Sequence, residues 1–315
     1  MPRARIKVAL LCAALAATGL PALAQVQAGR IVGTVYDPQR ATVPRATVSV
    51  TNVATNQSRR VTTNETGDFV VTPLEPGTYD ASATASGFRT TVQRGIELQV
   101  GQAVRVSLEL RLGETATTVE VTAEVPLLNT ESGTMGQVIT NTQIMDLPLN
   151  GRNFTELGRL TPGAVLLPAT GSVNRIRPEA VNGTSISGVQ GQQVTFLLDG
   201  VDISEQHQGG TFIQTSIDAL QEFSVQQNAY SAEYSRAGGF YNATTKSGAN
   251  KLHGGLFEFL RNDKLDARDF FALQREVLKR NQFGGTLGGP IVIPGVYNGQ
   301  DTMFFFVSYE GLRER

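Results

Sequence analysis

The stretch Val104-Arg105-Val106-Ser107-Leu108-Glu109-Leu110-Arg111-Leu112 alternates apolar residues with polar or charged ones. Because successive side chains of a β-strand point to opposite faces, this alternation predicts a strand that buries one face, with Leu112 in the core. Residues 46–50, 79–83 and 96–100 alternate in the same way, and turn formers such as Glu75-Pro76-Gly77 separate such stretches. We therefore predict that residues 29–112 form a small antiparallel β-sandwich of about seven strands.

Short motifs follow one another through this segment in a fixed order. They are Gly33-Thr34-Val35-Tyr36-Asp37, Ala46-Thr47-Val48-Ser49-Val50, Thr63-Asn64-Glu65-Thr66-Gly67-Asp68-Phe69, Leu74-Glu75-Pro76-Gly77-Thr78-Tyr79 and Ala85-Ser86-Gly87-Phe88. The ordered set resembles the carboxypeptidase regulatory-like domain, which implies a transthyretin-like β-sandwich. Domains of this shape sometimes bind carbohydrate, although this chain has no Trp to stack on a sugar ring.

The N-terminus has the three parts of a secretory signal peptide, which we predict over residues 1–24. A basic start with Arg3, Arg5 and Lys7 precedes an apolar run, and Ala22-Leu23-Ala24 forms a small-residue cleavage site. The only cysteine, Cys12, lies inside this segment, so the exported chain is expected to carry no disulfide and no thiolate metal site. No later apolar run reaches the roughly 18 residues of a spanning helix, which leaves a β-barrel as the expected way to cross a membrane.

Composition argues against several classes of function. The chain has 27 basic and 28 acidic residues and a net charge of −1, which offers no basic surplus for nucleic acid. The only histidines, His207 and His253, belong to no zinc-binding pattern, and neither a Gly-x-Ser-x-Gly elbow nor a phosphate-binding loop occurs. We therefore expect no enzyme activity, no metal and no cofactor.

Residues 113–123 form a polar, Thr-rich linker that is extended by preference. An extended segment can pair edge-on with the sheet of another protein through its backbone. A plain interdomain linker and a last strand of the sandwich are the alternatives for the same residues.

Residues 124–248 carry a second ordered set of motifs. It runs from Pro126-Leu127-Leu128-Asn129 through Leu147-Pro148-Leu149-Asn150-Gly151-Arg152-Asn153-Phe154, Val181-Asn182-Gly183 and Asp199-Gly200-Val201 to Thr244-Thr245-Lys246-Ser247-Gly248. This order resembles the α+β plug domain of TonB-dependent outer-membrane receptors, and the run ending at Phe154 resembles their Oar-like branch. The polar run Phe223-Ser224-Val225-Gln226-Gln227 departs from the common plug pattern.

The resemblance implies a role for the linker. Its last residues are similar to the Ton box, the short segment that recruits the energising protein TonB. The implied TonB-binding residues are Thr117, Thr118, Val119, Glu120, Val121, Thr122 and Ala123.

Individual residues of 124–248 also allow simpler interpretations. Asp199 and Gly200 predict a turn in which Asp199 bonds its own backbone. Gly238-Gly239 indicates close backbone packing or positive φ. Arg152 reaches Glu156 at i+4 if that stretch is helical, and Ile217 could share a helical face with Leu220.

Residues 249–315 are expected to begin an outer-membrane β-barrel. Phe257 and Phe259 alternate with Glu258, and Phe305, Val307 and Tyr309 alternate with Ser308 and Glu310. Lipid-facing strands place apolar residues outside and polar residues inside. Phe304 and Phe306 break this alternation and are expected in an aromatic girdle or against the plug.

The length predicts an incomplete barrel. Transporters of this kind close about 22 strands of roughly 9–11 residues each, which residues 249–315 cannot supply. We therefore expect a mainly β chain that is the N-terminal part of a longer receptor.

The resemblance implies active uptake of an unidentified substrate across the outer membrane of a Gram-negative-type bacterium, with the sandwich in the periplasm. TonB, outer-membrane lipid and the cargo are the implied partners. Siderophore, glycan, peptide and adhesion roles stay open. The alternative is a secreted or periplasmic β-sandwich module that binds carbohydrate or protein.

Overall fold

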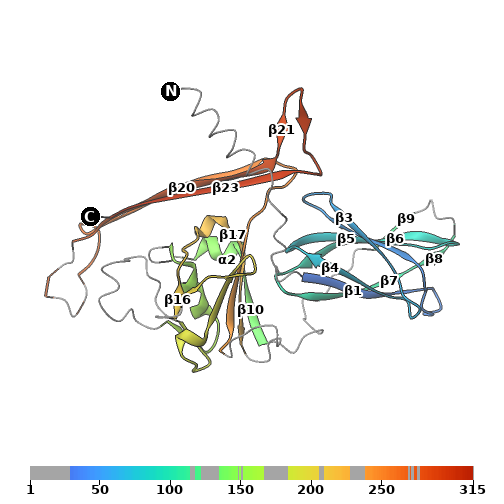
Figure 1. Ribbon diagram of the computed structural model, residues 1–315, viewed down its shortest axis with the longest axis horizontal. Helices are drawn as coiled ribbons and strands as arrows, with labels where there is room; N and C mark the ends of the chain where they lie inside the picture. The colour runs from blue at the N-terminus through green and yellow to red at the C-terminus, as the bar shows by residue number, and fades with distance from the viewer. Residues whose placement is uncertain are drawn as a thin grey trace, which may run out of the picture.

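The computed structural model describes residues 29–113, 118–121, 135–147, 149, 152–166, 184–205, 209–227, 238–268, 270, 273–274 and 277–314. The predicted signal peptide, residues 1–24, lies outside them. The chain is mainly β and forms a sandwich, a central α+β unit and a sheet of long strands (Figure 1). Within these ranges, no helix combines the length and apolar character needed to cross a membrane.

Two sheets make up the sandwich. One has the order β4-β1-β7 and the other the order β3-β2-β5-β6. The strands are β1 (Gly29–Tyr36), β2 (Thr47–Asn52), β3 (Ser58–Thr62), β4 (Asp68–Leu74), β5 (Gly77–Thr84), β6 (Phe88–Leu98) and β7 (Ala103–Glu109). The alternating residues meet between the sheets, where the core contains Ile31, Val48, Val50, Phe69, Ala81, Ala83, Ile96, Leu98, Val104, Val106, Leu108 and Leu110.

Leu112 departs from the predicted alternation, because its side chain is 63% exposed. The chain leaves the first sheet after Leu110, whose N–H donates to the Tyr36 carbonyl at 2.8 Å. It then forms β8 (Arg111–Leu112), which pairs with Phe88 and Arg89 of the second sheet. The move from one sheet to the other ends the period-two pattern, so the expectation of a buried Leu112 was wrong.

The central unit is built on one five-stranded sheet with the order β10-β17-β18-β13-β14. Only the β13–β18 pair is parallel in this sheet. Two pairs of short antiparallel strands, β11–β12 and β15–β16, accompany it. The strands are β10 (Met135–Thr140), β11 (Ala164–Leu166), β12 (Thr184–Ile186), β13 (Thr195–Leu198), β14 (Val201–Asp202), β15 (Ser204–Glu205), β16 (Gly210–Thr211), β17 (Leu220–Gln227) and β18 (Phe240–Thr245).

Among the residues that the structure describes, four short helices accompany this sheet. They are α2 (Asn141–Asp146) and the 3-10 helices η2 (Phe154–Leu160), η4 (Gly191–Gln193) and η5 (Ile217–Ala219). The side chain of Gln143 accepts a hydrogen bond from the Thr140 N–H at 3.1 Å, which satisfies a free donor at the start of α2. The expected helical face shared by Ile217 and Leu220 is absent, because the helix ends at Ala219 and Leu220 begins β17.

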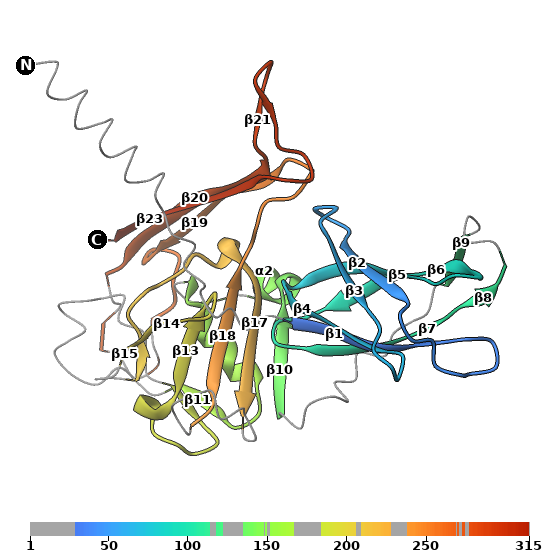
Figure 2. The ribbon, with the colours of Figure 1, turned by 45° about the vertical axis from the view of Figure 1, so that its right-hand side comes forward.

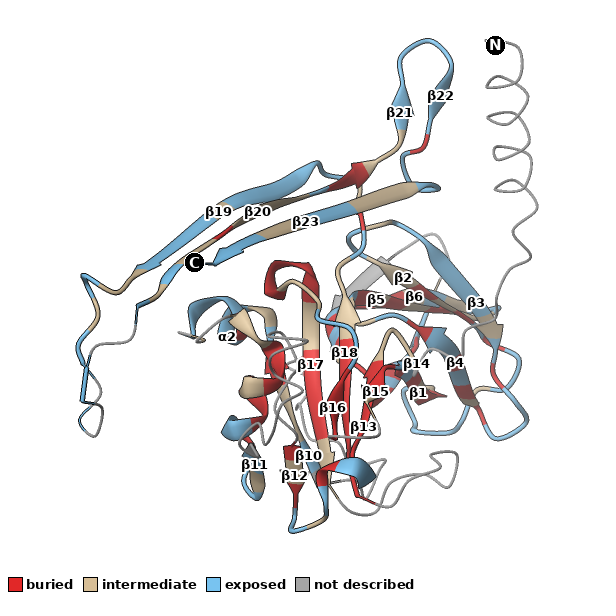
Figure 3. Cartoon of the chain, turned by 60° about the vertical axis from the view of Figure 1, so that its left-hand side comes forward, coloured by how far each residue is buried: buried red, intermediate tan, exposed pale blue. Residues whose placement is uncertain are grey.

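The strands of the central unit are largely buried (Figure 3), and their core contains several aromatic side chains. Phe196 stacks on Tyr241 with ring centroids 4.8 Å apart, and Phe154 meets Phe223 edge-on at 5.7 Å. Gly238 and Gly239 permit tight packing nearby: a Cβ on Gly238 would lie 2.7 Å from the Gln193 carbonyl oxygen, and Gly239 has a φ of +103°. The predicted role of this Gly pair is confirmed.

Three long antiparallel strands form what we call the terminal sheet. They are β19 (His253–Asn262), β20 (Lys279–Pro290) and β23 (Phe304–Glu314), in that order and without a register shift. The sheet crosses over one end of the central unit, and the hairpin β21 (Val292–Ile293)–β22 (Tyr297–Asn298) projects from the β20–β23 connection (Figures 1 and 2).

The sandwich contacts the other two units through a few polar bonds. Asn56 Nδ2 donates to Asp301 Oδ1 at 2.9 Å, and Asn250 donates to the same carboxylate oxygen at 2.7 Å. The Asn250 N–H also donates to the Ala54 carbonyl at 3.0 Å. A cavity of about 790 Å³ lies beside these contacts, between the sandwich and the start of β23.

The sandwich core leaves no space for a side chain at Gly33 in β1. A Cβ at this position would lie 1.9 Å from the Val106 carbonyl oxygen and 2.8 Å from the Phe69 ring. We expect Gly33→Ala to lower the free energy of unfolding by about 1–3 kcal/mol, because backbone and a buried ring must both shift. Chemical denaturation measures the loss. Val32→Ala, at a half-exposed neighbour on the other face, is the control, and equal stability of the two variants would contradict the packing argument.

Candidate functional site

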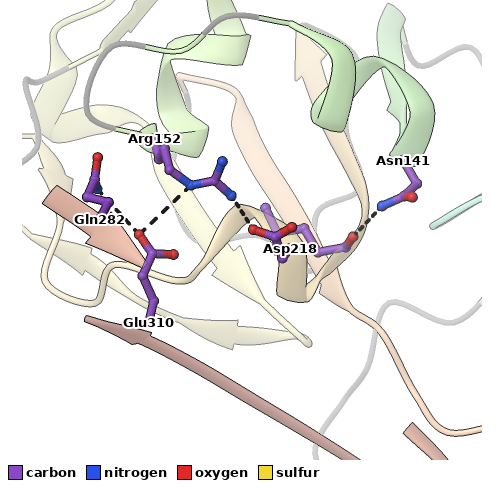
Figure 4. A network of polar contacts seen from close by, with 6 residues as sticks. Asn141, Arg152, Asp218, Gln282 and Glu310 are labelled. Carbon is purple, nitrogen blue, oxygen red and sulfur yellow. Dashed lines mark hydrogen bonds and ion pairs between the residues drawn. The ribbon is translucent and has the colours of Figure 1, made fainter. Parts of the chain in front are cut away.

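Arg152 lies just before η2, in a backbone conformation that turns it out of the helix. Its φ is +53°, and Asn153 caps η2 by accepting a hydrogen bond from the Thr155 N–H at 3.0 Å. The residue therefore stands at a sharp turn between two helical segments. This turn directs its guanidinium toward the terminal sheet (Figure 4).

The guanidinium of Arg152 joins the central unit to the terminal sheet. Its Nη2 is hydrogen-bonded to the carboxylate of Asp218 in η5, and its Nε lies 4.0 Å from Glu310 Oε1 on β23. The same group lies over two rings of β19, 4.5 Å from the centroid of Phe257 and 4.4 Å from that of Phe259. We call these five residues the Arg152 cluster.

Burial makes the Arg152 cluster energetically important. The side chains of Arg152 and Asp218 are each 11% exposed, so their attraction is little screened by water. A desolvated cation over an aromatic face contributes up to about 2 kcal/mol. Arginine keeps its charge at any physiological pH, so its partners must compensate that charge permanently.

Further contacts hold the partners in place. Gln282 Nε2 on β20 donates to Glu310 Oε1 at 3.4 Å. Asn141 Nδ2 donates to the Leu220 carbonyl at 2.8 Å, which ties α2 to the chain that follows η5 (Figure 4). A cavity of about 690 Å³ adjoins the cluster and is lined by α2, Arg152 and the facing residues of β19 and β20.

Arg152 does not pair with Glu156, the partner suggested by helical spacing. The segment forms a 3-10 helix that begins at Phe154, after Arg152, so the i+4 geometry of an α-helix is absent. Asp218, far along the chain, takes the place of Glu156. The condition under which Glu156 was expected, a helix that includes Arg152, is therefore not met.

The lipid-facing assignment of Phe257 and Phe259 is corrected too. Both rings face Arg152 and hence the central unit, so Glu258 lies on the opposite face of β19. Gly284, the register partner of Phe257, leaves room for this ring, because a Cβ there would lie 2.6 Å from it. On β23 the alternation places Phe304 and Phe306 on the same inward face as Glu310.

Asp199 forms a different turn contact from the one expected. Its φ is +49°, and its carboxylate accepts hydrogen bonds from the Thr245 N–H and the Thr245 hydroxyl, both at 2.8 Å. It therefore ties the end of β13 to the end of β18 instead of bonding its own backbone.

The predicted Ton box is described in part. Its residues Thr118–Val121 form β9, which pairs in parallel with Thr90–Gln93 of β6. Thr117, Thr122 and Ala123 lie outside the described residues. Of the interpretations that the sequence left open, the backbone pairing matches an added strand of the sandwich, and it leaves the TonB-binding role untested.

A buried carboxyl links the sandwich to the central unit. Glu222 Oε2 on β17 accepts a hydrogen bond from the Val100 N–H at 2.8 Å. Burial raises the pKa of Glu222 to about 7, the nearby Glu97 carboxylate adds to the rise, and the Val100 N–H opposes it. Within the described ranges, no three His, Cys, Asp or Glu residues are grouped to hold a metal ion.

Sequence reasoning missed Asp218, Glu310 and Glu222. The only local signal was Arg152 itself, a charge that follows Asn150-Gly151 in the sequence. Its partners come from distant elements, and single-sequence spacing carries no information about them.

The chain was then compared with known proteins. The carboxypeptidase regulatory-like domain family matches residues 30–111, and the outer membrane beta barrel domain family matches residues 244–315. The curated TonB-dependent transporter Oar of Myxococcus xanthus is 27% identical over 302 residues, which cover 90% of this chain and 26% of that protein. This chain is similar to an Oar-type TonB-dependent receptor.

The chain spans about a quarter of the length of this curated relative. Among solved structures, it is similar to the siderophore receptor PirA from Acinetobacter baumannii, with 21% identity, a TM-score of 0.37 and coverage of 50% of this chain and 22% of PirA. The unliganded ferric citrate transporter FecA gives 14% identity, a TM-score of 0.42 and coverage of 57% and 25%. The resemblances drawn from the regulatory-like and barrel motifs are confirmed by the two family matches.

Arg152→Ala should loosen the central unit from the terminal sheet. Loss of the guanidinium removes both ring contacts and leaves the Asp218 carboxylate without its main partner, a cost of about 2–3 kcal/mol. Hydrogen exchange of residues 152–160 in the folded full-length protein should accelerate. Arg159→Ala, at an exposed arginine of η2, is the control, and equal exchange in both variants would contradict the role of the cluster.

Glu222 predicts a pH-dependent contact between the sandwich and the central unit. Its pKa is raised from 4.5 to about 7, so the contact is strongest below pH 4.5 and weakens as the pH rises through about 7. Exchange at Val100 should therefore increase between pH 5 and 8 more steeply in the native protein than in Glu222→Gln, by up to about two orders of magnitude. Identical pH profiles would exclude Glu222 as the titrating group.

Proposed function

We propose that this chain is the N-terminal part of a TonB-dependent outer-membrane transporter. The Arg152 cluster carries the proposal, because a charged group of the central unit is enclosed by the inner face of long antiparallel strands. That arrangement suits a plug held inside a barrel wall, and the similarity to Oar along most of the chain supports it. The terminal sheet then begins the barrel, and the central unit acts as its plug.

The positions of the strand ends support a periplasmic sandwich. The chain enters β19 next to Asn250 and turns between β20 and β23 at Asp301, and both residues bond each other and the sandwich. These ends of β19, β20 and β23 therefore lie on the sandwich side of the terminal sheet. A chain exported by a signal peptide and energised by TonB meets TonB in the periplasm, so this side faces the periplasm.

Uptake in this proposal needs no chemical step on the cargo. TonB binds residues 117–123 and transmits force to the central unit, which rearranges and opens a path along the barrel wall. The Arg152 cluster is one of the contacts that must break when the central unit moves. The cargo is an unidentified substrate.

The Ton box proposal predicts that TonB binding and uptake can be lost without loss of membrane insertion. Replacing residues 117–123 with a Gly-Ser segment of equal length keeps the tether but removes the strand-forming residues. We expect the purified C-terminal domain of TonB to lose binding to the full-length protein and cargo uptake to stop. Insertion into the outer membrane should stay normal. It is measured by the heat-modifiable migration of the protein in gels.

A Gly-Ser replacement of residues 267–273, in the β19–β20 connection, is the matched control. This change alters the chain far from the proposed TonB contact and should leave TonB binding intact. Undiminished binding after the 117–123 replacement would overturn the Ton box assignment.

A further inference from the structure

The connection between β20 and β23 carries an uncharged hairpin, β21–β22. Residues 291–300 contain no Asp, Glu, Lys or Arg. Within them, the side chains of Val292, Ile293, Val296 and Tyr297 are exposed, and Val296 is 80% exposed. Apolar side chains that gather on one exposed element mark a surface of contact with lipid or with protein.

Polarity changes along the hairpin from its tip to its base. The tip is a turn, Ile293-Pro294-Gly295-Val296, closed by a hydrogen bond from the Val296 N–H to the Ile293 carbonyl at 3.0 Å. Tyr297 directs its hydroxyl toward the base, where it lies 3.4 Å from the Thr302 hydroxyl. The next residue of the base, Asp301, accepts a hydrogen bond from Asn56 of the sandwich. The polar end of the hairpin therefore adjoins the sandwich, and the apolar end points away from it.

Backbone contacts fix the place where the hairpin leaves the terminal sheet. The Ile291 N–H donates to the Met303 carbonyl at 2.9 Å, and the Met303 N–H donates to the Gly299 carbonyl at 2.8 Å. The base is tightly packed, because a Cβ on Gly299 would lie 2.6 Å from the Ile291 carbonyl oxygen. In three views the hairpin projects from the terminal sheet away from the central unit (Figures 1, 2 and 3).

The face of the terminal sheet that turns away from the central unit is apolar as well. Val307 and Tyr309 alternate with Glu310, which faces Arg152, so both lie on the outward face. Leu287 is the register partner of Val307 and shares that face. All three outward side chains are exposed. The hairpin thus continues an apolar surface of the kind that a barrel turns to lipid.

We propose that the tip of the β21–β22 hairpin inserts into the membrane leaflet that surrounds the sandwich-side ends of β20 and β23. The ligand is phospholipid, and the inference rests on the proposed barrel. The tip enters the acyl region, the Tyr297 ring lies among the headgroups as aromatic residues do at membrane interfaces, and Asp301 stays in water beside the sandwich.

The chemistry of the tip suits this insertion. It carries no charge that would have to be desolvated. Pro294 and Gly295 form a turn that is already ordered, with a φ of +75° at Gly295, so little conformational entropy is lost when the tip enters lipid. A protein that covers the tip, such as a second copy of this chain, is the competing outcome.

A fluorescent probe at the tip tests where it lies. The full-length protein, free of other cysteines, carries Val296→Cys labelled with bimane in nanodiscs of phosphatidylethanolamine and phosphatidylglycerol. Val70→Cys, at an exposed valine of β4 in the sandwich, is the matched control. We expect lipid spin-labelled near its headgroup to quench the Val296 probe about threefold more than the Val70 probe, and aqueous iodide to quench it about threefold less.

Two results would overturn the inference. Equal quenching of the Val296 and Val70 probes by iodide would place the tip in water. Protection of the Val296 probe from both iodide and spin-labelled lipid would show that protein covers it. Heat-modifiable migration in gels verifies that each labelled variant is folded.

A third probe separates this inference from the proposed function. Val307→Cys places the same label on the outward face of β23, where the proposed barrel contacts lipid whether or not the hairpin does. If spin-labelled lipid quenches the Val307 probe but not the Val296 probe, the barrel stands and insertion of the hairpin is refuted. If lipid quenches neither probe, the barrel assignment itself fails and the hairpin inference fails with it.

Discussion

A cation that cannot be neutralised is the constraint around which this structure is organised. Arg152 stays charged, so each element that encloses it must supply compensation: a carboxylate from η5, a second from β23 and two ring faces from β19. This requirement fixes which face of the terminal sheet turns inward. It also explains why Phe257 and Phe259 face the central unit although their alternation with Glu258 resembles that of a lipid-exposed strand.

Local patterns predicted the fold well where the cause is local. Period-two alternation identified the sandwich strands, and the Gly238-Gly239 pair indicated close packing, because both depend on neighbours in the chain. The prediction that Leu112 is buried failed because the chain changes sheets after Leu110. The face of β19 and the partner of Arg152 could not be predicted because they depend on Asp218 and Glu310. Only the tertiary structure brings these two residues close to Arg152.

The sandwich is attached more loosely than its own core is packed. A few bonds at Asn56, Asn250 and Glu222 hold it, and a cavity of about 790 Å³ adjoins them. Small polar contacts between domains allow relative motion. Two rigid sheets joined by such contacts allow the sandwich to move as a body relative to the central unit.

The edges of the larger sandwich sheet bear on the tendency of the chain to associate with itself. An open edge is a template for aggregation. β3 at one edge is only five residues long and carries the exposed Arg59 and Arg60. At the other edge, β8 and β9 cover the segment from Phe88 to Gln93. β8 and β9 thus replace the long edge of β6 with edges of only two and four residues. Short edges pair poorly with a second chain, so both ends of this sheet oppose self-association.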